Sequence, residues 1–135
     1  MSQITNMRTT KIIFWISTSI VALMMTMSVW MYFTNPEVSA GFVHLGFSDT
    51  FRLELGVAKL LGIAGLLIPL PARLKEWVYA GFTFTFISAF VAHTAAGDPL
   101  KAVIMPLIVL GVLAVSYWSY HKLQGVSGTL KPSVA

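Results

Sequence analysis

Residues 51–70, FRLELGVAKLLGIAGLLIPL, decide the fold class, because this segment is long and apolar enough to cross a membrane and still contains Glu54 and Lys59. A membrane-spanning helix needs about 20 mostly apolar residues, since the hydrocarbon core of a bilayer is about 30 Å thick. Charged side chains are rare inside such segments. The two charges must therefore be explained together with the fold.

The composition of the whole chain points to the membrane as its solvent. Of its 135 residues, 56% are hydrophobic and 10% are charged, and the mean hydropathy is +0.78. A soluble domain carries about 25% charged residues, so this chain could not cover a water-exposed surface. Four segments have the length and apolar character of spans, at residues 12–33, 53–72, 77–97 and 102–120.

Long apolar runs of this kind favour helices over the strands of about 10 alternating residues that build membrane β-barrels. We therefore predict an all-α, integral membrane four-helix bundle over residues 1–123, followed by a disordered C-terminal tail at 124–135. We expect the first span to be retained, because it exceeds the apolar core of a signal peptide, about 7–15 residues, and three more spans follow.

The basic residues predict the orientation of this bundle. With four spans, six of the Lys and Arg residues fall on the side of both termini and two fall on the other side. Loops rich in Lys and Arg stay in the cytoplasm. We expect both termini to be cytoplasmic, in a multi-pass protein of the cell membrane, with a bacterial inner membrane as the expected location.

Several classes of function lack support. The chain has no cysteine, which excludes thiol chemistry, disulfides and thiolate metal sites. Its basic residues are scattered and form no stripe for nucleic acid. No short spacing of histidines predicts a metal site. The lipid bilayer is the partner that the composition predicts.

Glu54 and Lys59 permit two interpretations. Five residues separate them by about 140° around a helix, so they cannot neutralise each other as an i,i+4 pair would. In the first interpretation the stem of Lys59 reaches toward the headgroups and Glu54 favours the N-terminus of its helix. In the second, both line a polar pocket inside the bundle.

The second interpretation gains from residues expected at the same membrane face. His93 lies near the end of the third span, Asp98 follows in a tight turn, and His44 comes from the long segment 35–50. We predict a candidate polar pocket of Glu54, Lys59, His93, Asp98 and His44. A carboxylate beside a histidine can pass protons or hold the head of a quinone or another amphipathic ligand.

The opposite face carries a second group of charges, which we expect in a tight turn after Pro69 and Pro71: Arg73, Lys75 and Glu76. Small residues predict where helices approach closely. Ala58, Gly62 and Gly65 form one such face, and a second runs along the third span from Gly81. Packing within the bundle is the favoured role of these faces, and a homodimer seam is the alternative.

Four stretches in order resemble the DoxX-like family of small four-helix membrane proteins. They are Asn35-Pro36, then Glu54 with GVAKLLG at 56–62, then RLKEWVYAGF at 73–82 and AHTAAGD at 92–98. The resemblance covers roughly residues 11–122. The residues to which the family pattern points are Glu54, Lys59, Arg73, Glu76, His93 and Asp98.

The resemblance implies a four-helix membrane bundle. The family takes its name from a subunit of an archaeal thiosulfate:quinone oxidoreductase, and most of its members have no established activity. We therefore expect an accessory subunit of a membrane redox or quinone-linked complex, with membrane oxidoreductase subunits as partners and a quinone as the candidate ligand. No haem, flavin or iron–sulfur motif is present. The alternative is a proton-coupled binder, an enzyme or a small transporter for an amphipathic molecule.

Overall fold

The computed structural model describes the backbone of residues 2–130 and the side chains of residues 6–125. Within this range the chain is all-helical and contains no strand, which confirms the predicted class. Its helices are α1 (Ser2–Thr34), α2 (Pro36–His44), α3 (Asp49–Leu67), α4 (Ala72–Ala95) and α5 (Leu100–Leu130). The predicted count of four helices omits α2.

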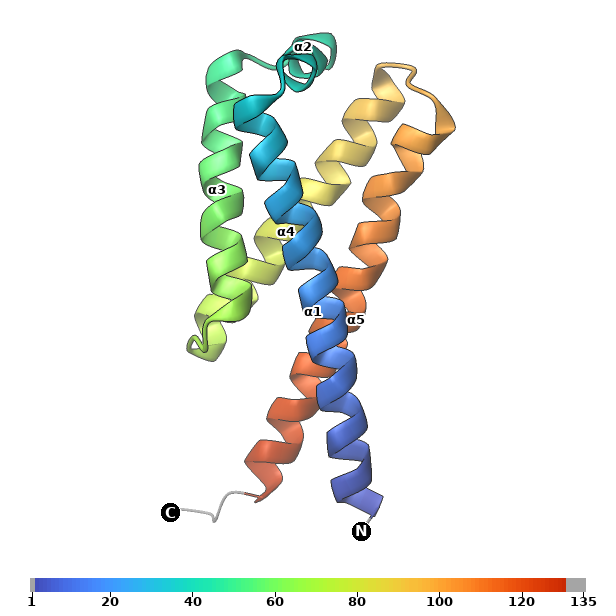
Figure 1. Ribbon diagram of the computed structural model, residues 1–135. Coiled ribbons are helices and arrows are strands. Elements are labelled where there is room, and N and C mark those ends of the chain that lie inside the picture. Colours follow the sequence, from blue (N-terminus) through green and yellow to red (C-terminus); the bar gives the residue numbers. More distant parts are fainter. Residues whose placement is uncertain (1, 131–135) are drawn as a thin grey trace.

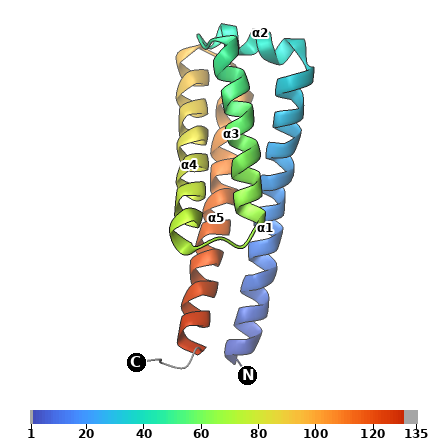
Figure 2. The same cartoon turned by 90° about the vertical axis from the view of Figure 1, so that its left-hand side faces the viewer.

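The four long helices run alternately up and down, and α2 lies across one end of them (Figure 1). We call this end the α2 end. The start of α1 and the last turns of α5 lie at the opposite end, which we call the terminal end, and both extend beyond the connection between α3 and α4 (Figure 2). Among neighbouring long helices, α3 and α4 pack least extensively, and they diverge toward the α2 end (Figure 1).

Three helices are long and apolar enough to cross a membrane, over Asn6–Thr34, Ala72–Ala95 and Leu100–Gly125. They correspond to the predicted spans 12–33, 77–97 and 102–120. Helix α3 corresponds to the predicted span 53–72, but its 19 residues include four charged ones, namely Asp49, Arg52, Glu54 and Lys59. Its place as a span therefore depends on where these charges point.

The predicted turn at residues 73–76 is wrong. Helix α3 ends at Leu67, and α4 begins at Ala72 directly after Pro71, because proline cannot continue the preceding helix but is tolerated where a helix starts. Lys75 is buried, with its ammonium donating to the carbonyls of Gly65 and Leu66 at 2.7 and 2.9 Å. Since the last carbonyls of a helix lack intrahelical partners, Lys75 caps α3.

Helix α2 lies across the end of the bundle and connects α1 to α3 (Figure 1). Asn35 caps the helix, because its Oδ1 accepts a hydrogen bond from the backbone N–H of Glu37 at 2.9 Å, and Pro36 starts it. Arg52 at the start of α3 donates to the backbone carbonyl of Tyr32 near the end of α1. These contacts hold the α1–α2–α3 connection together.

Hydroxyl groups link α1, α4 and α5 in the buried centre. Ser116 Oγ lies 2.6 Å from Thr18 Oγ1 and 2.7 Å from Tyr79 Oη, so each helix supplies one member. Thr18 and Ser116 are fully buried. In lipid such interhelical hydrogen bonds contribute on average about 0.6 kcal/mol each, and their geometry fixes the relative register of the three helices.

The C-terminal tail differs from expectation over part of its length. Helix α5 continues to Leu130, so residues 124–130 extend the helix in place of the predicted disorder. A continuous stretch without proline lets the helix run on. Residues 131–135 lie outside the described residues.

Gly62 and Gly65 of α3 pack within the bundle as predicted, and Gly81 of α4 does not. A Cβ at Gly62 would lie 2.6 Å from Phe82 Cζ, and one at Gly65 would lie 2.5 Å from Val78 Cγ2. Side chains of α4 therefore rest directly on the backbone of α3. Gly81 on α4, in contrast, is exposed with open space around it.

We expect Gly62→Ala to destabilise the protein by about 1–3 kcal/mol, the usual range for overpacking a tight contact. Phe82 is buried and stacks on Phe86, with ring centroids 5.9 Å apart, so it has little room to retreat. Thermal unfolding in detergent measures the effect, with Gly81→Ala as the matched control. Equal unfolding midpoints for the two variants would contradict the close contact.

Candidate functional site

Three of the five predicted pocket residues meet at the α2 end. Asp98 lies in the connection between α4 and α5, and its Oδ1 is 2.7 Å from Nε2 of His44 on α2. Its Oδ2 is 2.6 Å from Nδ1 of His93 in the last turn of α4. We call His44, Asp98 and His93 the His–Asp–His cluster. One carboxylate thus joins α2 to the end of α4.

The backbone after α4 places Asp98 for this role. Gly97 adopts φ +70°, a left-handed conformation that ends helices and favours glycine. The N–H of Asp98 then donates to the carbonyl of His93 at 3.1 Å. The turn therefore brings the Asp98 carboxylate back over the imidazole five residues earlier.

The His–Asp–His cluster borders an apolar cavity of about 230 Å³, which we call the α2-end pocket. His93 is its one imidazole. Aromatic rings from α2 and the start of α3 form one wall, and small residues of α4 form much of the other. Phe47 and Phe51 stack with ring centroids 4.7 Å apart. A wider surface cavity of about 650 Å³ shares Phe47, Phe51 and Ser88 with the pocket and contains His44.

Asp98 fixes the proton positions of the cluster. Hydrogen bonds from His93 and His44 lower the pKa of Asp98, so the carboxylate is ionised at neutral pH and can only accept. His93 must then carry a proton on Nδ1. Its Nε2 makes no hydrogen bond within residues 6–125, where all side chains are described, and His93 borders the α2-end pocket.

Lys59 and Glu54 do not join the cluster. The Lys59 side chain is buried against α1, where its Nζ donates to Ser28 Oγ at 2.9 Å and to Tyr32 Oη at 2.6 Å. Glu54 is exposed and makes no hydrogen bond or ion pair with the described part of the chain. The structure therefore does not place Glu54 and His93 in one pocket.

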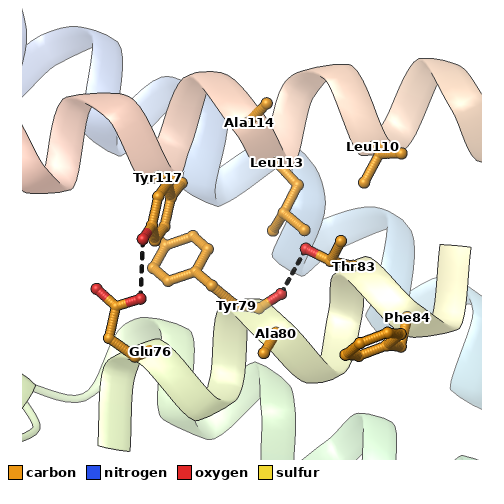
Figure 3. A pocket seen from close by; sticks show the side chains of 9 residues that line it. All are labelled: Glu76, Tyr79, Ala80, Thr83, Phe84, Leu110, Leu113, Ala114 and Tyr117. Atoms are coloured by element: carbon orange, nitrogen blue, oxygen red, sulfur yellow. Dashed lines mark hydrogen bonds between the residues drawn. The ribbon is translucent and has the colours of Figure 1, made fainter. Parts of the chain in front are cut away.

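The terminal end holds a second carboxylate with two partners. Glu76 accepts a hydrogen bond from Tyr117 Oη at 2.9 Å and pairs with His121 Nε2 at 2.5 Å. It borders a cavity of about 350 Å³ between α4 and α5. Figure 3 shows the hydrogen bond between Glu76 of α4 and Tyr117 of α5 at the border of this cavity, and Thr83 bonded back to the carbonyl of Tyr79. Arg73 is exposed at the start of α4.

The described residues contain no cluster of side chains with the arrangement of a metal site. Among the described residues, no group of three or more His, Cys, Asp or Glu side chains could hold a metal ion. In the His–Asp–His cluster the carboxylate and the imidazoles are bonded to one another. Their donor atoms therefore do not converge on an empty point.

The sequence model of the DoxX-like family matches residues 16–116, which include most of α1 and all of α2, α3 and α4. The chain belongs to the DoxX-like family. No curated protein and no solved structure matches this family member. The matched region contains the His–Asp–His cluster, Lys59 and the Lys75 cap.

Sequence reasoning missed the partners of the charged residues. Ser28 and Tyr32, which bind Lys59, lie in a span without charges, and their i,i+4 spacing was their only signal. The burial of Lys75 was missed because it depends on the turn at the two prolines. The aromatic wall of the α2-end pocket comes from residues 42–51, whose mixed composition gave no periodic pattern.

We expect Asp98→Asn to loosen α2 and the end of α4, because an amide cannot accept from two imidazoles with the strength of a carboxylate. Hydrogen exchange of residues 36–47 should accelerate severalfold. Glu54→Gln is the matched control, since Glu54 is exposed and forms no hydrogen bond or ion pair with α2.

The stabilisation of the fold by Asp98 depends on pH, and the direction of this dependence can be stated. Because the folded state lowers the pKa of Asp98 below its ordinary value of 3.8, the ionised carboxylate stabilises the fold at pH values above that value. This contribution disappears as the pH falls through the lowered pKa. The quantity to measure is the protection of α2 from hydrogen exchange, corrected for the pH dependence of the intrinsic rate. Equal protection of α2 in Asp98→Asn and in the native chain at neutral pH would contradict the bridging role of Asp98.

Proposed function

We propose that this DoxX-like protein crosses the membrane four times and binds the head of an amphipathic molecule of the quinone type in its α2-end pocket. The fourth crossing is α3. Its 19 residues would extend about 28 Å at about 1.5 Å per residue, close to the thickness of the hydrocarbon core. Its mid-helix charge, Lys59, is buried against α1 and so is shielded from lipid.

The distribution of basic residues supports a cytoplasmic terminal end. Arg8, Lys11, Arg73 and Lys122 belong to that end, whereas Arg52 and Lys101 belong to the α2 end. Under the positive-inside rule the His–Asp–His cluster then faces the outside of the cell membrane, in bacteria the periplasmic side of the inner membrane.

The absence of native cysteines makes this topology directly testable. We expect a cysteine at Val43, exposed on α2, to react with a membrane-impermeant maleimide added to intact cells. A cysteine at Ala72, exposed at the start of α4, should react only after the membrane is opened. Labelling of both from the same side would show that α3 does not span.

The observation that carries the ligand proposal is the open Nε2 of His93 at the edge of an aromatic pocket. With Nδ1–H bonded to Asp98, a neutral imidazole accepts a hydrogen bond at Nε2, and the protonated imidazole donates one. A quinol hydroxyl needs an acceptor and a quinone carbonyl needs a donor, so His93 can serve both forms. Phe47 and Phe51 offer faces on which a ring can stack.

The proposed role is accessory. No haem, flavin or iron–sulfur motif is present in the sequence, so electrons must come from a partner, and membrane oxidoreductase subunits are the proposed source. The pocket would present the quinone head to such a partner. A homodimer through the small residues of α4 stays a prediction.

The three histidines of the chain allow a direct test. In protein labelled with ¹⁵N-histidine and held in lipid nanodiscs, decylubiquinone should shift the Nε2 resonance of His93. His121 at the terminal end is the internal control and should not shift. Ala89→Leu, which fills the α2-end pocket, should remove the effect, whereas Ala80→Leu, which borders the other cavity, should preserve it. Equal shifts of His93 and His121 would overturn the proposal.

A further inference from the structure

Two lysines are buried in this bundle, and neither contacts an acid. Lys59 is 7% and Lys75 is 6% exposed. The chain has five acidic residues. Asp49 pairs with Arg52, Asp98 with two histidines and Glu76 with His121, while Glu37 and Glu54 are exposed. Buried charges are normally paired, so each lysine needs another explanation.

Lys75 has an explanation within the fold, and Lys59 does not. The two carbonyls that Lys75 binds belong to the C-terminal end of α3, which carries partial negative charge. The partners of Lys59 are the neutral hydroxyls of Ser28 and Tyr32. The ring of Tyr32 adds a cation–π contact, with Nζ 4.1 Å from its centroid, but supplies no negative charge.

Lys59, Ser28 and Tyr32, which we call the Lys59 group, have more hydrogen-bond donors than they have acceptors for them. An ammonium has three N–H donors and no acceptor, so both hydroxyl oxygens accept from Lys59. The third ammonium proton and the Tyr32 hydroxyl proton are bonded to no acceptor within the part of the chain whose side chains are described. The group therefore offers at least two donors and one positive charge to whatever enters.

Space for such a ligand lies beside Lys59. A cavity of about 170 Å³, which we call the α3–α4 cavity, is bordered by Lys59 and by apolar or small residues of both helices, with Thr85 as its one hydroxyl. Ala58 and Gly81 border it and are exposed. The cavity thus opens outward between α3 and α4, which pack least extensively among neighbouring long helices, and in a membrane this opening faces the acyl chains.

We propose that Lys59, Ser28 and Tyr32 bind the anionic headgroup of a single-chain lipid, such as the carboxylate of a fatty acid, which enters between α3 and α4. A carboxylate supplies the missing charge and acceptors for both remaining donors. The apolar walls of the α3–α4 cavity suit the first methylene groups of the chain. This site is separate from the one that contains His93.

The test uses oleate labelled with ¹³C at its carboxyl carbon, added to the full chain in phosphatidylcholine nanodiscs. The expected result is a separate bound carboxylate resonance. Lys59→Met keeps much of the side-chain length and removes the charge, and it should weaken binding at least tenfold. Tyr32→Phe removes one donor while keeping the ring, and it should weaken binding severalfold even if Lys59→Met fails to fold.

Two glycines provide a matched steric control. Gly81→Leu should block the cavity, because Gly81 borders it and has open space around it. Gly111 on α5 has equally open surroundings but borders no described cavity, so Gly111→Leu should bind oleate normally. Unchanged oleate binding in Lys59→Met, or in Gly81→Leu, would overturn the proposal.

Further experiments distinguish the possible ligands from one another and the two proposed sites from each other. Oleyl alcohol should not displace oleate, because it lacks the charge, and displacement by it at equal concentration would overturn the anionic requirement. Dioleoyl phosphatidate should compete more weakly than oleate. Tighter binding of phosphatidate would overturn the single-chain assignment. The quinone-dependent shift of His93 should persist in Lys59→Met, so failure of one site is visible without the other.

Discussion

The buried ammonium of Lys59 sets the rotation of α3 within this bundle. A charge in the middle of an apolar helix must reach polar partners, and here these are Ser28 and Tyr32 on α1. Once Lys59 faces α1, the helical period determines the other faces. Glu54, about 140° away, turns outward, and Gly62 and Gly65 turn toward α4, whose Phe82 and Val78 pack onto them. The aromatic packing between α3 and α4 is therefore linked to one polar contact with α1.

Both ends of the bundle are held by a carboxylate, although the side chains that bind it differ. At each end one carboxylate receives two side chains from neighbouring elements. Asp98 joins α2 to α4 through His44 and His93, and Glu76 of α4 binds two side chains of α5. Charge-assisted hydrogen bonds of this kind hold helices at fixed positions where apolar packing alone gives little preference. At the α2 end, His93 and His44 each also keep one ring nitrogen without a partner in residues 6–125, and each borders a cavity, which makes that end the better candidate for ligand binding.

Composition and hydropathy were sufficient to predict the helical class, and the positions of His44, His93 and Asp98 near one face were sufficient to predict that these three meet. The separation of Glu54 and Lys59 by about 140° excluded an i,i+4 pair. The predicted pocket nevertheless contained both residues, and the structure separates them. The location of the turn was mispredicted because the charges at 73–76 resemble a loop, whereas the backbone limits of Pro69 and Pro71 place the turn before them. Ser28 and Tyr32 could not be identified as the partners of Lys59 from the sequence. Pairs of hydroxyl residues occur in many spans, and only the fold shows which pair lies opposite a lysine.

The α2-end pocket and the α3–α4 cavity adjoin, since both are bordered by Leu55 and Thr85. Their polar groups nevertheless favour different ligands. The His–Asp–His cluster contains its own carboxylate, so an added anion there would meet negative charge, and a neutral carbonyl or hydroxyl suits it better. The ammonium of Lys59 and the hydroxyls of Ser28 and Tyr32 carry unpaired donors and one positive charge, so a neutral head would leave the charge uncompensated. The two proposed ligands, a neutral ring and an acid, would therefore occupy adjoining sites with opposite electrostatic requirements. They would touch at Leu55 and Thr85, which border both cavities.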